Sequence, residues 1–283
     1  MSKVLDGKVA IITGGSRGLG AVLAATLADQ GADIAITYAA SADKAESVAE
    51  VVRAKGVRAL AIRCDQADTS AAKPMVEQVV AELGKLDILI NNAAIAVQGK
   101  LVDDPTLDSA AFDRQWMVNV MGTVAITRAA AQKISDGGRI VFIGSGLGTR
   151  AIVPGIADYA GTKAAIAGYA RGVQRDLGPR NITVNVVQPG IMPTDMTGEV
   201  AALIDQMPFI LYALLSLAVV IAVPHSQWNL LAVTAHGIAL FCRPYFGLVG
   251  WNRKSQSCMH ERDSLTPISE VRKSSKGYGD PIL

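Results

Sequence analysis

Short apolar runs alternate along the chain with longer segments in which apolar residues recur every three or four positions. The short runs predict buried β-strands and the longer segments predict helices. The predicted strands are Val9–Ile12, Asp33–Tyr38, Arg58–Arg63, Leu86–Ile90, Arg139–Gly144 and Ile182–Val187. The predicted helices lie near 18–30, 42–55, 69–83, 106–132 and 159–178. Six strands separated by helices predict an α/β fold in three layers, a doubly wound parallel sheet covered on both faces.

The turn after the first predicted strand is rich in glycine. Thr13–Gly20 reads Thr-Gly-Gly-Ser-Arg-Gly-Leu-Gly and leads directly into a predicted helix. A strand, a glycine turn and a helix start together present backbone N–H groups to a phosphate. Gly14, Gly18 and Gly20 let the backbone approach a pyrophosphate, because a side chain there would hold the ligand off. The pattern predicts dinucleotide binding at the carboxyl ends of the strands, where the sheet order reverses.

The character of the sequence changes near Pro208. From Phe209 to Gly250 the only formally charged side chain is Arg243. We therefore predict an α/β domain over 1–207, an atypical apolar segment over 208–250 and a polar, disordered tail over 251–283. The almost unbroken apolar run Phe209–Val223 is shorter than the roughly 17–25 residues that span a bilayer. Contact of 209–250 with a membrane surface remains an open alternative.

Charge and cysteine content exclude several classes of protein. A formal net charge of +2 offers no basic field that would attract nucleic acid. The three cysteines Cys64, Cys242 and Cys258 are too few and too scattered for a disulfide framework or a zinc site. The N-terminus carries charged residues and enters the first predicted strand within nine residues, so no signal peptide fits there. These features predict a cytoplasmic protein that binds no metal.

Chemically versatile side chains gather late in the predicted sheet domain. Tyr159 and Lys163 are four positions apart at the start of a helix, which places the phenol and the ammonium on one face. A nearby Lys⁺ favours phenolate, lowers the tyrosine pKa from about 10 and makes Tyr159 a usable general acid. Ser145 ends a predicted strand, and Asn119 lies within the predicted helix 106–132. Taken singly, each residue also fits an ordinary structural position.

Taken together, these residues resemble the short-chain dehydrogenase/reductase family, and within it the 3-oxoacyl-carrier-protein-reductase-like members, over roughly residues 5–207. Thr13–Gly20 fits the TGxxxGxG turn of the family, and Asn91–Ala94 fits its NNAG segment with alanine in the last place. Pro189, Gly190 and Thr194 fit its PG-x-x-x-T cofactor loop. The resemblance implies a Rossmann-type fold and an NAD(P)(H)-dependent oxidoreductase that acts on a carbonyl or a secondary alcohol.

The resemblance also implies a catalytic tetrad of Asn119, Ser145, Tyr159 and Lys163. Tyr159 would give its proton to the substrate carbonyl oxygen while hydride arrives from the nicotinamide, and Ser145 would hydrogen-bond the same oxygen. Lys163 would hold the nicotinamide ribose, and Asn119 would anchor a water that replaces the proton. The implied cofactor-binding residues are Gly14, Ser16, Arg17, Gly18, Leu19, Gly20, Asp65, Asn91, Ala93, Tyr159, Lys163, Pro189, Gly190 and Thr194.

The second predicted strand indicates which cofactor is bound. A carboxylate at its end would bind the ribose 2′-OH of NAD, whereas a 2′-phosphate needs a cation. No acid follows Thr37–Ser41 until Asp43, and Arg17 lies in the glycine turn, so NADP(H) is favoured over NAD(H). Asp65 matches the family position beside adenine, although an aspartate that caps the next turn would look the same.

The chain departs from the family after Met207, where nothing resembles the usual last helix and strand. A shifted reading frame, a membrane-associating extension and a divergent folded replacement all fit this segment. In many relatives the missing elements form a subunit interface, so a homo-oligomer is expected but a tetramer is in doubt. The substrate is a small carbonyl or alcohol of undetermined kind, and loops 97–104 and 191–207 are expected to shape its pocket.

A nucleotide-binding protein with little turnover, serving as a regulatory or membrane-associated scaffold, is the alternative function. The complete tetrad favours the enzyme, because a protein that only binds a nucleotide has no chemical need for all four residues.

Overall fold

The computed structural model describes residues 3–151, 153–190, 192, 194 and 196. The predicted apolar segment 208–250 and the tail 251–283 lie outside these residues. Within the described part of the chain, no helix is long and apolar enough to cross a membrane.

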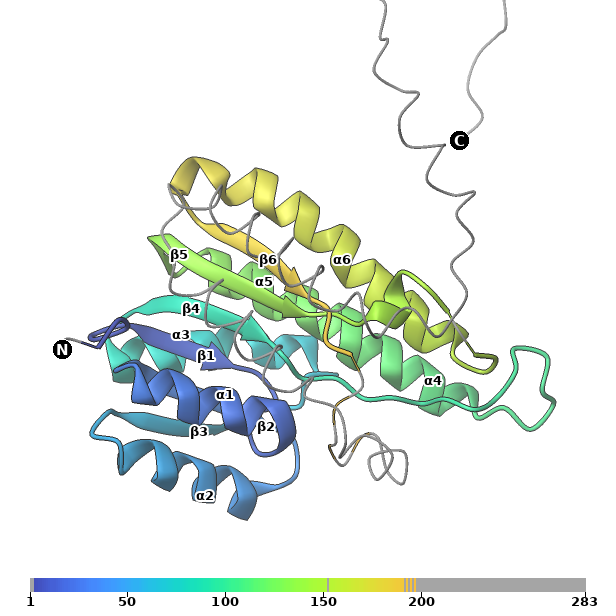
Figure 1. Ribbon diagram of the computed structural model, residues 1–283, viewed down its shortest axis with the longest axis horizontal. Helices are drawn as coiled ribbons and strands as arrows, with labels where there is room; N and C mark the ends of the chain where they lie inside the picture. Colours follow the sequence, from blue (N-terminus) through green and yellow to red (C-terminus); the bar gives the residue numbers. More distant parts are fainter. Residues whose placement is uncertain (1–2, 152, 191, 193, 195, 197–283) are drawn as a thin grey trace, which may run out of the picture. The chain divides into compact units, whose positions relative to one another are not determined.

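Six parallel strands form one sheet in the order β3-β2-β1-β4-β5-β6 (Figure 1). Their bounds are β1 Val9–Ile12, β2 Asp33–Tyr38, β3 Ala59–Arg63, β4 Leu86–Asn91, β5 Ile134–Ile143 and β6 Thr183–Val187. The order reverses between β1 and β4, and ligands of doubly wound sheets bind outside the carboxyl ends of the strands at such a point. The predicted doubly wound, Rossmann-type sheet is therefore confirmed.

Helices cover both faces of the sheet (Figure 1). Their bounds are α1 Gly18–Asp29, α2 Ala42–Arg53, α3 Ala72–Leu83, α4 Ser109–Trp116, α5 Thr123–Ala131 and α6 Ala157–Leu177. Alternate residues of a strand point to opposite faces. Val9 and Ile11 accordingly pack into one apolar core with residues of α3, α5 and α6. Ala10 and Ile12 pack into a second core with residues of α1 and α2, which completes the three layers.

The single helix predicted over 106–132 is wrong in the middle, where a π-helical turn, Met117–Gly122, separates α4 from α5. The loop after β3 approaches the helix at this turn. Gln66 Nε2 donates to Val118 O at 2.8 Å, and a Cβ on Gly122 would overlap the Gln66 carbonyl. Wide turns of this kind are frequent at functional sites. Hydrophobic periodicity alone does not show such a local widening, because the apolar positions on either side still follow a helical pattern.

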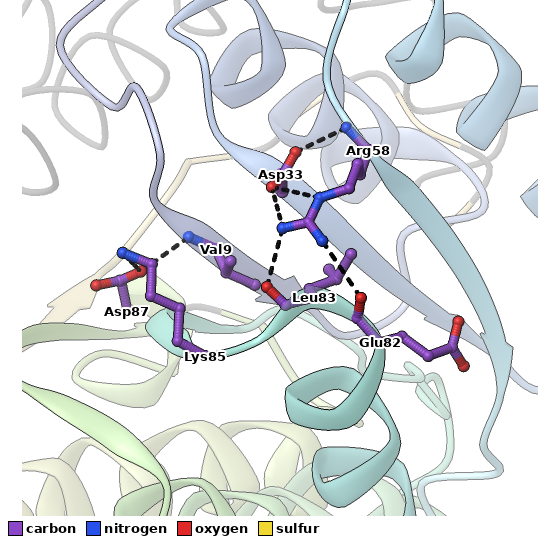
Figure 2. A network of polar contacts seen from close by, with 7 residues as sticks. All are labelled: Val9, Asp33, Arg58, Glu82, Leu83, Lys85 and Asp87. Atoms are coloured by element: carbon purple, nitrogen blue, oxygen red, sulfur yellow. Dashed lines mark hydrogen bonds and ion pairs between the residues drawn. The ribbon is translucent and has the colours of Figure 1, made fainter.

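Charged side chains make hydrogen bonds at the amino ends of the strands. These ends lie on the opposite side of the sheet from the glycine turn, which follows the carboxyl end of β1. Figure 2 shows Arg58, which contacts Asp33 Oδ2 through Nη2 at 2.7 Å and donates to Leu83 O at the end of α3 at 2.9 Å. On β4, Asp87 Oδ2 accepts the N–H of Val9 on β1 at 3.0 Å. These contacts tie β2 to α3 and β4 to β1 at the amino ends of the strands, opposite the carboxyl ends where the dinucleotide is predicted to bind.

Candidate active site

The glycine turn is locked against the segment that follows β4. Thr13 Oγ1 accepts the N–H groups of Asn92 at 3.0 Å and of Ala93 at 2.9 Å. Asn92 Nδ2 donates in return to the carbonyls of Thr13 at 2.8 Å and Gly14 at 3.1 Å. Gly14 has φ +64°, and a Cβ there would lie 2.9 Å from Ala93 Cα. Both the backbone conformation and the close approach therefore require glycine at position 14.

The start of α1 suits an anion. Arg17, in extended conformation, occupies the N-cap position, and no side chain caps the helix. The first backbone N–H groups of a helix have no partner within the helix, so a phosphate can accept their hydrogen bonds. Gly18 opens the helix with φ +54°, and a Cβ there would lie 3.6 Å from Thr194 Cγ2. The segment after β6 therefore lies beside the turn, as the predicted cofactor loop requires.

The end of β2 lacks a carboxylate. Thr37 Oγ1 accepts the Gly14 N–H at 3.2 Å, which joins this strand to the glycine turn. The exposed Ala39 follows, and Asp43, the next acid along the chain, is exposed on α2. Arg17 is exposed in the turn on the neighbouring strand. The residues present thus fit a nucleotide whose ribose carries a 2′-phosphate.

Asp65 makes two contacts at the end of β3. Its carboxylate pairs with Arg114 Nη2 of α4 at 2.9 Å and accepts the Ala67 N–H at 3.0 Å. The hydrogen bond from Arg114 is the largest cause that lowers the pKa of Asp65. The turn-capping alternative for this aspartate is thus present in the structure. A contact of Asp65 with adenine stays a prediction.

Three of the four predicted catalytic side chains meet where β5 ends and α6 begins. Tyr159, on the first turn of α6, is 8% exposed, and the Ser145 hydroxyl just beyond β5 lies close enough to its phenol to act on the pKa of Tyr159. One helical turn later, Lys163 is 4% exposed and donates from Nζ to Ile143 O at 2.9 Å. The Lys163 Nζ lies 5.7 Å from the centroid of the Tyr159 ring. The arrangement brings a proton donor, a hydroxyl and an ammonium group together.

The prediction that Lys163 lowers the pKa of Tyr159 is not confirmed. Burial raises the pKa of Tyr159 above 10.0, and only the hydrogen bond from Ser145 opposes it. Burial also lowers the pKa of Lys163 to about 8. The cost of removing both groups from water outweighs the attraction between ammonium and phenolate, since the ammonium is directed at a backbone carbonyl.

Asn119 lies in the π-helical turn and is 2% exposed. Its Oδ1 accepts the Ile95 N–H at 2.9 Å, and its Nδ2 donates to Ile95 O at 2.9 Å and to Thr162 Oγ1 at 3.2 Å. Thr162 in turn donates to Tyr159 O at 2.8 Å. The side chain therefore connects the segment after β4 with the turn of α6 that carries Tyr159. Its predicted role in anchoring a water stays a prediction.

The remaining predicted cofactor residues differ in orientation. Pro189 and Gly190 follow β6 at the carboxyl edge of the sheet, as expected. Asn91 ends β4, but its Nδ2 donates to Thr127 Oγ1 of α5 at 3.0 Å, so this side chain is turned into the packing of the sheet. Ser16 and Leu19 are half-buried in the turn. Which of these residues contact a cofactor stays a prediction.

Several residues that shape the site were not predicted. Thr13, Asn92 and Thr162 make the hydrogen bonds that hold the glycine turn and the turn of α6 that carries Tyr159. Each stands next to a predicted site residue in the sequence, and this adjacency is the feature from which they could have been predicted. Arg114 and Gln66 lie outside those motifs, and their contacts depend on how distant segments meet.

Comparison with known proteins identifies the class that this fold and site define. Residues 8–204 match the family model of short chain dehydrogenases. Versicolorin reductase 1 of Aspergillus parasiticus is 40% identical over 68% of this chain and 72% of its own length. Elsinochrome reductase 1 of Elsinoe fawcettii is 38% identical over 68% and 71%. A short chain dehydrogenase from Burkholderia cenocepacia in complex with NADP is 45% identical, with a TM-score of 0.70 over 76% of this chain and 91% of that one.

The chain belongs to the short-chain dehydrogenase/reductase family. It is thus an NAD(P)-dependent oxidoreductase, as the motifs predicted.

Proposed function

We propose that the protein is an NADPH-dependent reductase of carbonyl compounds, with 3-oxoacyl thioesters as its first candidate substrate class. The proposal is carried by the buried Tyr159 phenol beside the Ser145 hydroxyl, where β5 ends and α6 begins, with Lys163 Nζ 5.7 Å from the Tyr159 ring centroid. Such a pair can donate a proton to a carbonyl oxygen and stabilise the negative charge that develops on it.

The chain's own residues have distinct roles in this proposal. The Ser145 hydroxyl hydrogen-bonds the substrate oxygen and holds it beside the phenol. Tyr159 delivers the proton to that oxygen. Lys163 holds the ribose of the nicotinamide, while the glycine turn and the start of α1 bind the pyrophosphate. NADPH, when bound, supplies the hydride.

Two observations support NADP(H) as the cofactor. The end of β2 carries no carboxylate, while Arg17 stands in the glycine turn. Among the solved relatives, the Burkholderia cenocepacia protein is in complex with NADP. A blue fluorescent protein from a metagenomic library, 39% identical with a TM-score of 0.68, is in complex with NADPH.

Polycyclic aromatic ketones are a second candidate substrate class. The relatives include versicolorin reductases and a probable tetrahydroxynaphthalene reductase of Zymoseptoria tritici, 37% identical over 68% of this chain. Loops after β4 and β5 are joined by a hydrogen bond from Gly99 N to Gly155 O at 2.8 Å. They expose Leu101, Val102 and Val153, which are 52%, 76% and 53% accessible. These exposed apolar side chains, on the loops that lead into α4 and α6, favour a broad, apolar substrate.

Oxidation of NADPH, followed by absorbance, tests both classes on the full-length protein. Acetoacetyl thioesters represent the first class and hydroxylated naphthalenones the second, with Tyr159→Phe as the inactive control and NADH as the alternative cofactor. Reduction of either class with NADPH, lost in the control, supports the proposal. Tight NADPH binding without turnover of any carbonyl would support the scaffold alternative. Light scattering on the same sample tests the expected homo-oligomer.

A further inference from the structure

Trp116, the last residue of α4, contacts the first turns of α6 at two points. Its indole Nε1–H donates to Asp158 Oδ1 at 2.7 Å. An ideal Cβ on Gly161 would lie 3.1 Å from both Cζ2 and Cη2 of the indole, closer than the usual carbon separation of about 3.5–4.0 Å. The ring therefore lies directly on the backbone of α6. The two contacted residues flank Tyr159 along this helix.

The start of α6 depends on these contacts for its orientation. Ile156 occupies the N-cap position, and no side chain caps the helix. Asp158 lies in the first turn, where a carboxylate commonly interacts with the helix terminus, yet it accepts the indole N–H of Trp116. Glycine inside a helix is less favourable than alanine, and the closeness of the indole gives a reason for Gly161. The turn that carries Tyr159 is thus held from outside α6.

Helix α4 is itself held at other points, so it provides a fixed support. Arg114 Nη2 bonds Asp65 Oδ2 beyond β3 at 2.9 Å. Gln115, which is fully buried, accepts the Val97 N–H beyond β4 through Oε1. Three consecutive residues of α4 therefore contact three separate segments around the site. Figure 1 shows α4 beside the start of α6.

We propose that Trp116 is a positioning residue for the proton donor Tyr159 and acts through Asp158 and Gly161. As a statement about catalysis it rests on the proposed function, but the environment of Tyr159 can be measured without turnover. Positioning has a large effect on rate, because a displacement of about 1 Å can cost about a hundredfold.

Steady-state kinetics with the best substrate is the first test. Trp116→Phe keeps a ring but removes the N–H donor, and we expect kcat to fall about tenfold with the KM for NADPH unchanged. Asp158→Ala should give a similar loss, whereas Asp158→Asn keeps an acceptor oxygen and should retain most of kcat. The double variant W116F/D158A should fall no further than the lower single variant, because both remove one interaction. Asp113→Asn, an exposed change on α4, is the matched control.

Titration of Tyr159 is the second test and needs no substrate. The phenol is followed by NMR in full-length protein labelled with carbon-13 tyrosine, with Y159F to assign its signal. Lys163 and Asp158 are the charged neighbours on α6, and Ser145 approaches from the end of β5. W116F replaces none of these residues and removes only the indole N–H that Asp158 accepts. Because burial raises the pKa of Tyr159, loosening the turn should move its titration midpoint down toward 10.0.

The outcomes separate this proposal from the proposed function. If the unmodified protein reduces no carbonyl, the proposed function fails and the titration alone decides. Unchanged kcat in both W116F and D158A, or losses confined to the KM for NADPH, would overturn the positioning role. A Tyr159 midpoint in W116F equal to that of the unmodified protein would overturn it as well.

Discussion

Replacement of Lys163 by methionine probes how the folded protein buries a charge in the first turns of α6. The side chain is 4% exposed, and its ammonium donates a hydrogen bond to the carbonyl of Ile143 at 2.9 Å. Methionine keeps an unbranched apolar side chain of similar length but cannot carry the charge. The variant therefore removes the titration of this group and leaves most of the packing in place.

The size of the effect follows from the pKa of Lys163, which burial lowers from 10.5 to about 8. Each factor of ten in acid dissociation corresponds to about 1.4 kcal/mol, so burying the charged form costs about 3 kcal/mol. Between the two pKa values the unfolded chain binds more protons than the folded chain. The free energy of unfolding contributed by this group must consequently rise as pH increases from 8 to 10.5. Loss of the hydrogen bond to Ile143 costs the variant about 1 kcal/mol at every pH.

Urea unfolding of both proteins at a series of pH values between 7 and 11 measures this contribution. The free energy of unfolding of the unmodified protein minus that of Lys163→Met should increase by about 3 kcal/mol from pH 8 to 10.5. Tyr159 acts in the opposite sense above pH 10, because its pKa is raised, but it is present in both proteins and largely cancels in the difference. A difference that stays constant over this range, or falls, would refute the burial of a charged lysine in the folded state.

Three other predictions concern the donor, the cofactor and the π-helical turn. Tyr159→Phe should leave NADPH binding nearly unchanged, measured by fluorescence, and lower kcat by at least about a hundredfold because the proton donor is lost; a normal rate would remove Tyr159 from the mechanism. Arg17→Glu with Ala39→Asp should move the ratio of kcat/KM values from NADPH toward NADH, since carboxylates repel a 2′-phosphate; a preference for NADH in the unmodified protein would contradict the reasoning. Gly122→Ala places a methyl group on the Gln66 carbonyl and should destabilise the fold by about 1–3 kcal/mol, visible as a lower urea midpoint; an unchanged midpoint would contradict that close approach.

The strands and the glycine turn could be predicted from the sequence because they depend on short-range patterns. Val9–Ile12 is fully buried between two helical layers, so every position is apolar and the strand stands out. The Thr13–Gly20 motif follows it directly, and the glycine at position 14 is required by a local backbone conformation. The spacing of Tyr159 and Lys163 likewise places both on one helical face whatever surrounds them.

Features that depend on contacts between segments far apart in the sequence could not be predicted in this way. The π-helical turn arises where Gln66, more than fifty positions earlier, bonds Val118. The pKa of Tyr159 could not be obtained from the nearby Lys163, because burial by several elements outweighs one neighbouring charge.

The sequence by itself determined which chemical groups the site contains and the parallel sheet that carries them, since motif spacing and hydrophobic pattern are properties of neighbouring residues. Only the tertiary structure decided how those groups are oriented. Asn91 is turned toward α5, Asp65 is paired with Arg114, and Trp116 supports the turn of Tyr159. Desolvation and hydrogen bonding act over a few ångströms in space, and the residues that come within that distance are set by the packing of the whole domain.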